Sequence, residues 1–88
     1  MSENLHVLHE LEQRLTRFVA GTEEDISLWA ANQIEGCIAV SLPEGDELQE
    51  FADSLAQYRP EGGDHLFNYE DMRPHAISAL EEVRRRIG

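Results

Sequence analysis

The fold class follows from residues 5–19, which read LHVLHELEQRLTRFV. Apolar side chains recur in this stretch every three or four residues, with polar side chains between them. They are Leu5, Leu8, Leu11, Leu15, Phe18 and Val19. This spacing places them along one face of an α-helix. Gly21 is suited to end the helix, because glycine readily adopts the left-handed conformation common just after a helix C-terminus.

Three further segments show the same period, at about residues 23–39, 44–58 and 71–87. Their main apolar positions are Ile26, Trp29, Ala30, Ile34, Cys37 and Ile38; Leu48, Phe51, Ala52, Leu55 and Tyr58; and Met72, Ala76, Ile77, Leu80, Val83 and Ile87. Because Trp29 shares a face with Ile26 and Ile34, we expect its ring to be mostly buried. Its replacement by alanine is then expected to cost about 3–5 kcal/mol.

Residues 59–63 interrupt the helical pattern before the last helix. Pro60 disfavours helix at the preceding residue, and the paired Gly62 and Gly63 permit positive φ angles. Residues 64–69 are too few for a standard helix and predict one tight helical turn or an ordered loop. With 88 residues, the chain has room for one domain. The sequence therefore predicts an all-α, four-helix bundle-like single domain over residues 1–88, with a short helical turn before the last helix.

The chain is strongly acidic, and the charge is unevenly distributed. It has 18 acidic and 7 basic residues, giving a net charge of −11 at pH 7. Residues 44–71 hold nine of the acids against Arg59 as their one base. Such a field repels nucleic acid and anionic lipid and attracts basic surfaces. We therefore expect a basic protein partner, and neither a nucleic-acid nor a membrane partner.

The sequence offers no constellation typical of catalysis. His6 and His9 are three residues apart, but no cysteine or carboxylate cluster completes a metal site around them. Gly62-Gly63 lacks the lysine and the helix start of a phosphate-binding loop. We expect no enzyme activity, no cofactor and no metal. The single cysteine and the absence of a signal-peptide pattern or a long apolar stretch predict a cytoplasmic protein.

The candidate interface centres on residues 58–69, which read YRPEGGDHLFNY. Aromatic side chains lie here beside acidic ones, next to the most acidic predicted helix. Rigid aromatic residues surrounded by charge are typical of an interface hot spot with an electrostatic rim. The candidate partner-binding residues are Asp46, Glu47, Glu50, Asp53, Glu61, Asp64, Phe67 and Tyr69. In the alternative interpretation, Leu66 and Phe67 fill the gap between the third and last helices. The polar ends of Asp64 and Tyr69 need water or a partner.

Residues 60–68, PEGGDHLFN, resemble the segment around the short third helix of colicin and pyocin nuclease immunity proteins. In that family a Pro-x-Gly-x-Asp run leads into apolar residues and a tyrosine pair. Here Phe67 and Asn68 stand in place of the pair, and Tyr69 follows one position later. The family is similarly small, acidic and four-helical. The resemblance implies a cytoplasmic bacterial inhibitor that binds a secreted nuclease toxin through its second and third helices.

The leading hypothesis is an immunity or antitoxin-type toxin inhibitor whose acidic face, residues 44–58 and 61–69, docks on a basic toxin or nuclease domain. One alternative is a small homo-oligomeric structural or adaptor domain. Its N-terminal helix would pair with a second copy through Leu8, Leu11, Leu15 and Phe18. Another is a nucleic-acid mimic that occupies a DNA-binding protein. The sequence is compatible with a monomer or a homodimer.

Overall fold

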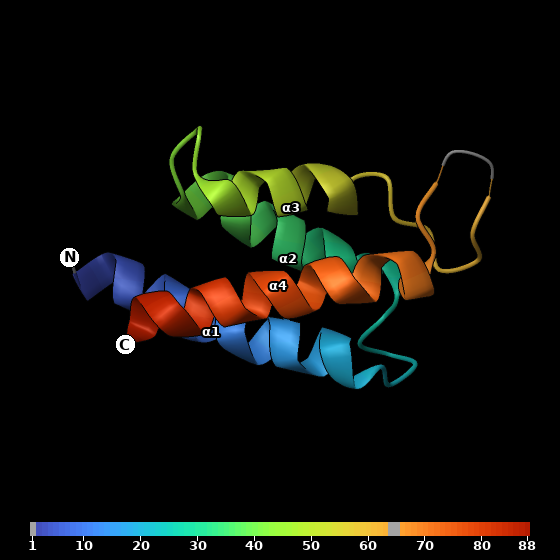
Figure 1. The fold of residues 1–88 in the computed structure, drawn as a ribbon, viewed down its shortest axis with the longest axis horizontal. Helices are drawn as coiled ribbons and strands as arrows, with labels where there is room; N and C mark the ends of the chain where they lie inside the picture. The colour runs from blue at the N-terminus through green and yellow to red at the C-terminus, as the bar shows by residue number, and fades with distance from the viewer. Residues whose placement is uncertain (1, 64–65) are drawn as a thin grey trace.

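The computed structural model describes residues 2–63 and 66–88, and these form a compact all-α fold. Within them lie four helices: α1 (Ser2–Ala20), α2 (Leu28–Ser41), α3 (Glu47–Leu55) and α4 (Tyr69–Ile87). The long helices α1 and α4 lie side by side and run antiparallel, while α2 contacts both α1 and α3 (Figure 1). The all-α fold predicted from the sequence is confirmed. None of these four helices combines the length and the apolarity that crossing a membrane requires.

The core is built from the apolar stripes of all four helices. In the predicted stripe of α1, Leu11, Leu15 and Phe18 have no exposed surface and Val19 is partly buried, but Leu5 is 43% exposed. Leu8 is also buried in the chain's own core. The four buried residues face the chain's own core, where α1 packs against α4 and α2, so they are not exposed for pairing with a second copy.

The second helix begins at Leu28 and not near residue 23. Thr22 and Asp25 form a side chain–side chain hydrogen bond within a separate turn that precedes the helix. Ser27 is the N-cap, and its hydroxyl accepts a hydrogen bond from the backbone N–H of Ala30 at 3.1 Å. A local hydrogen bond between short polar side chains, such as that between Thr22 and Asp25, stabilises a turn at the expense of helix.

Trp29 is 71% exposed, so the prediction that its ring is buried was wrong. The buried side chains of α2 are Ala31, Ile34 and Ile38. Trp29 lies about half a turn from Ala31 and Ile38, on the opposite side of the helix. Apolar residues surround most of α2, so the sequence period alone does not identify the face that packs inward. Replacement of Trp29 by alanine is accordingly expected to change stability by less than about 0.5 kcal/mol.

The third helix ends at Leu55, and Tyr58 lies beyond it in an isolated parallel bridge with Phe67. The backbone N–H of Arg59 donates to the Phe67 carbonyl at 2.8 Å, and the N–H of Phe67 donates to the Gln57 carbonyl at 3.0 Å. Phe67 therefore lies in a bridge and Asn68 is extended, so of the two expectations for this segment, a helical turn or an ordered loop, the described residues 66–68 fit the loop.

The last helix begins at Tyr69 and not near Asp71. Its N-cap is Asn68, and Asn68 and Asp71 each accept a hydrogen bond from the other's backbone N–H. This reciprocal arrangement satisfies two N–H groups that the first helical turn leaves unpaired.

The Tyr58 ring is fully buried and its edge packs on the Phe18 ring, with centroids 5.5 Å apart. Its hydroxyl donates to the Ile26 carbonyl at 2.6 Å, and burial raises the pKa of Tyr58 to about 12. We predict that Tyr58→Phe lowers the free energy of unfolding by about 1–2 kcal/mol, because the Ile26 carbonyl loses its donor. Urea denaturation measures this change, with Gln57→Ala as the exposed control; an unchanged midpoint for Tyr58→Phe contradicts it.

Candidate functional site

A groove of about 330 Å³ runs between α3 and α4. It is lined by Glu47, Leu48, Glu50, Phe51 and Ser54 from α3 and by His75, Ser78, Ala79 and Glu82 from α4. Leu48, Phe51 and Ala79 are buried and give the groove an apolar floor. Glu47 and Glu50 are exposed and form its acidic rim on α3. An apolar floor with a charged rim is the usual anatomy of a protein-binding surface.

The charges of Glu47 and Glu50 are not compensated within the described chain. The ion pairs among residues 5–63 and 66–88 use Glu10, Glu12, Asp46 and Glu82 as their acids. Both glutamates lie in the first turn of α3, where the positive end of the helix dipole favours them. They nevertheless remain open to solvent and to any cation that approaches the groove.

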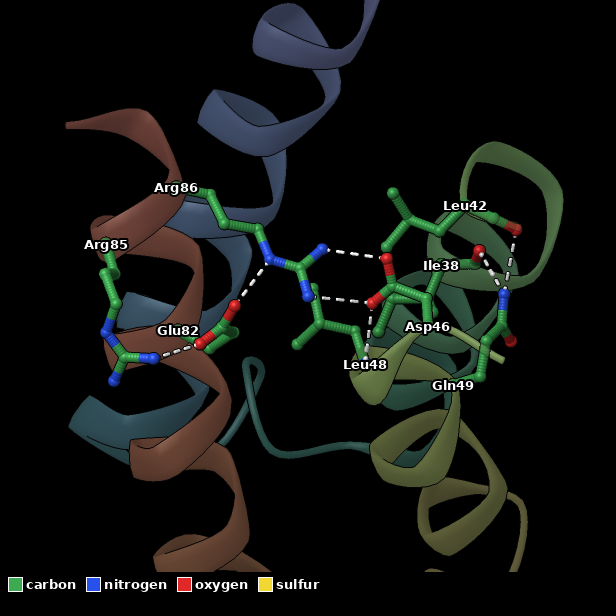
Figure 2. Close-up of polar contacts among 8 residues, drawn as sticks. All are labelled: Ile38, Leu42, Asp46, Leu48, Gln49, Glu82, Arg85 and Arg86. Atoms are coloured by element: carbon green, nitrogen blue, oxygen red, sulfur yellow. Dashed lines mark hydrogen bonds and ion pairs between the residues drawn. The ribbon is translucent and has the colours of Figure 1, made fainter. Parts of the chain in front are cut away.

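Arg86, near the C-terminus of α4, lies beside one end of the groove, where it contacts the lining residue Glu82 (Figure 2). Its two terminal nitrogens donate to the two carboxylate oxygens of Asp46, each at 2.9 Å. Its Nε donates to Glu82 at 2.6 Å, and Arg85 also contacts Glu82. A two-pronged arginine–carboxylate pair fixes direction as well as distance. We refer to Arg86, Asp46 and Glu82 as the Arg86 clasp.

The clasp fixes the start of α3 as well as the end of α4. Asp46 is the N-cap of α3, and its Oδ1 accepts a hydrogen bond from the Leu48 backbone N–H at 2.9 Å. One turn later, the Gln49 side chain donates to the Ile38 and Leu42 carbonyls at 3.1 and 2.9 Å, at the C-terminus of α2 (Figure 2). Three helix ends therefore meet beside this end of the groove.

The clasp also perturbs the acid–base behaviour of its members. Hydrogen bonding to Arg86 lowers the pKa of Asp46 and the pKa of Glu82. Hydrogen bonds to the two carboxylates raise the pKa of Arg86. All three groups are therefore charged at neutral pH. Asp46 was predicted to contact a partner, and the structure shows that its carboxylate already binds an arginine of its own chain.

The other predicted interface acids lie apart from the groove or outside the described residues. Asp53 is exposed on α3 but turned away from the groove lining. Glu61 is exposed in the turn at 59–62 that follows the Tyr58 bridge. Asp64 lies outside the residues that the structure describes. The structure therefore brings Glu47 and Glu50 together on one surface and separates Asp53 and Glu61 from them.

Phe67 and Tyr69 are both half-buried against the core but lie on different sides of α4. The Phe67 ring centroid is 6.2 Å from that of His75, so Phe67 lies near the end of the groove opposite the clasp. Tyr69 faces α1, and its ring centroid is 5.2 Å from that of Phe18. Its hydroxyl donates to the carbonyls of Phe18 and Val19 at 2.5 and 3.0 Å. The polar end of Tyr69 thus finds its partner within the chain.

The contribution of α4 to the groove was not expected from the sequence. His75, Ser78 and Glu82 follow one another at intervals of three and four residues, so they share a polar stripe. That spacing can be read from the sequence. The sequence does not show that α3 lies beside the stripe, because this depends on how α3 is placed in the fold. The same applies to Arg86, whose role requires Asp46 to lie opposite.

No group of three or more histidine, cysteine or acidic side chains suited to a metal ion occurs in the part of the chain that the structure describes. Comparison with family models, with curated proteins and with solved structures found no match to this chain. The functional argument therefore depends on the geometry and charge of the groove.

We predict that Asp46→Ala lowers the free energy of unfolding by about 2 kcal/mol and Asp46→Asn by about 1 kcal/mol. Asparagine keeps the helix cap but loses the charged pair, whereas alanine loses both. The folded-state pKa of Asp46 is lowered, so its contribution is present above the unfolded pKa and is lost as pH falls through the folded value.

The advantage of the wild-type chain over Asp46→Asn should therefore be present above the unfolded-state pKa, about 4, and shrink as the pH falls below it. Urea denaturation followed by circular dichroism at several pH values measures it. A difference that stays constant across this range contradicts the role assigned to the ion pair.

Proposed function

We propose that the chain is a non-enzymatic binding protein that inhibits a basic partner protein by docking its α3–α4 groove on a positively charged surface. The partner class that fits best is the basic domain of a bacterial toxin, with the chain acting as a cytoplasmic immunity or antitoxin-type inhibitor. The observation that carries the proposal is the uncompensated pair Glu47 and Glu50 above the apolar floor of the groove.

Charge supports a basic partner. Residues 44–71 hold nine acids and one base, and the groove lies within and beside this segment. Opposite charges steer the encounter of two proteins and raise the association rate, most strongly at low salt. A lysine or arginine that enters the groove finds carboxylates at the rim and apolar surface for its aliphatic stem.

Shape supports a preformed site. The Arg86 clasp lies beside the groove at one end, and the bridge between Tyr58 and Phe67 joins α3 to α4 at the other. A surface that is already ordered loses less entropy on binding than one that must fold. Inhibition then requires only that the docked chain cover the surface that its partner uses.

The resemblance to nuclease immunity proteins adds a second line of support. It covers residues 60–68, which connect α3 to α4 and adjoin the groove at Phe67. In that family the second and third helices bind the toxin; here α3, which precedes the matched segment, supplies the acidic rim. On this basis the inhibited partner is a nuclease toxin domain.

The first experiment is capture of partners from the native host with the tagged chain, at low and at high salt. We predict that Glu47→Lys/Glu50→Lys slows association with the captured partner at least about tenfold at low salt, and less at high salt. The matched control is Glu23→Lys/Glu81→Lys, which makes the same change in net charge at two exposed positions away from the groove.

Surface plasmon resonance measures the rates, and inhibition of the partner's nuclease activity tests the function. If both double variants slow association equally, the effect is one of bulk charge and the groove is not the site. If the partner shows no toxic or nuclease activity that the chain suppresses, the inhibitor proposal fails.

Phe67 is the predicted determinant of the lifetime of the complex, because its ring lies near the groove, whereas Tyr69, predicted from the sequence alongside it, faces α1 and is bonded there. We predict that Phe67→Ala speeds dissociation at every salt concentration, by an amount worth about 2 kcal/mol, because an aromatic anchor acts after the encounter. Tyr69→Phe is the companion variant, since it keeps the ring but removes the bonds to the Phe18 and Val19 carbonyls. Circular dichroism separates loss of binding from loss of fold: if Phe67→Ala merely unfolds, that ring is part of the core.

A further inference from the structure

The outer face of α2 carries large apolar side chains in solvent. Trp29 is 71% exposed and Val40 is 88% exposed. They are about three helical turns apart, so they lie on the same face of α2. Asn32, Gly36 and Ala39 lie between them on this face and are also exposed. We refer to these five residues as the outer face of α2.

This face has no charge, although the chain has a net charge of −11. The one charged residue of α2 is Glu35, which lies about a third of a turn from the line of Trp29 and Val40. Residues 44–71, by contrast, hold nine acids and one base, so two copies meeting through that segment would repel each other. The outer face of α2 allows two acidic chains to meet without that repulsion.

Gly36 gives an independent indication that something packs on this face. Glycine within a helix destabilises it by about 1 kcal/mol relative to alanine. Nothing in the described chain requires glycine here, because a Cβ at this position would meet no atom within 4 Å and the φ angle is not positive. A helix that crosses close to α2 from outside does require a small residue at the crossing point.

We propose that two copies of the chain associate through this face, with α2 antiparallel to α2 of the second copy about a twofold axis. In the register that the sequence favours, Trp29 of each copy covers Ala39 and Val40 of the other, and Gly36 lies opposite Asn32. Each pairing occurs twice, as twofold symmetry requires. The large side chain at one end of the face thus meets the aliphatic side chains at the other.

Charge complementarity favours the antiparallel arrangement. It places the positive N-terminal end of each α2 beside the negative C-terminal end of the other. A second groove, of about 460 Å³, lies beside Trp29, and its charged lining residues are Arg14 and Arg17 of α1 together with Glu24 and Asp25 before α2. Arg17 is exposed and makes no ion pair within the described ranges. It lies where the C-terminal end of the second copy's α2 approaches.

The area of contact sets the strength of the dimer. A helix of 14 residues is about 21 Å long. Its outer face buries less than the roughly 800 Å² per partner of a standard stable interface. The dimer is therefore weak, and monomer and dimer exchange with concentration. The outer face of α2 shares no residue with the α3–α4 groove, so the inference does not depend on the proposed function.

Analytical ultracentrifugation of the full chain between about 1 µM and 1 mM tests the inference, together with tryptophan emission over the same range. Trp29 is the single tryptophan of the chain, so its emission reports on this face alone. We expect a monomer–dimer equilibrium and a blue shift of the emission as the dimer forms. A chain that stays monomeric with unchanged emission at 1 mM overturns the proposal.

Two variants at exposed positions test the contact itself. Gly36→Leu places a bulky side chain at the helix crossing, and Val40→Lys adds a like charge to both copies. Each is expected to weaken the dimer at least tenfold, and Gly36→Leu should leave the monomer at least as stable as the wild type, because leucine favours helix. Leu5→Lys, a similar change at an exposed position on α1, should leave the dimer intact. A dimer that survives both α2 variants, or that Leu5→Lys dissolves equally, overturns the assignment of this face.

Discussion

The paired hydrogen bonds between Arg86 and Asp46 fix the position of α3, and the arrangement of the groove depends on them. With nine residues, α3 is too short to be stable as an isolated helix. Its order comes from its buried side chains and from the cap that Asp46 supplies. Because the same carboxylate binds α4 through Arg86, the direction of α3 relative to α4 is set by a planar, two-pronged contact. Apolar packing alone specifies such a direction less strictly.

The opposite end of the fold is held by two tyrosine hydroxyls. Tyr58 donates to the carbonyl of Ile26, before α2, and Tyr69 donates to carbonyls at the end of α1. Both rings contact Phe18, so one buried aromatic cluster anchors the connection between α3 and α4. These hydrogen bonds satisfy carbonyl groups at helix ends, which would otherwise cost stability when shielded from water. The groove thus lies between the Arg86 clasp at one end and this aromatic cluster at the other.

The sequence predicted what depends on local periodicity. Most of the apolar stripe of α1 is buried as expected, with Leu5 the exposed exception, and the four helical segments are found, because a strong 3.6-residue period leaves few alternatives. The predicted burial of Trp29 was wrong, because α2 is apolar on several sides and the choice between them is made by α1 and α3. Of the candidate site, Glu47 and Glu50 could be identified from charge density. The participation of Glu82 and His75 could not, since it requires the placement of α3 against α4.

The short length of α3 has a consequence for how the molecule opens. The long helices α1 and α4 are joined by a broad apolar contact, whereas α3 depends on a cap and an ion pair at one end. Regions held by few contacts exchange their amide hydrogens through local opening, at a lower free energy than global unfolding requires. Protonation of Asp46 removes the bond that α3 shares with α4 while leaving the α1–α4 pair intact. The attachment of the acidic surface to α4 is therefore sensitive to pH, while its packing on α2 is apolar and is not.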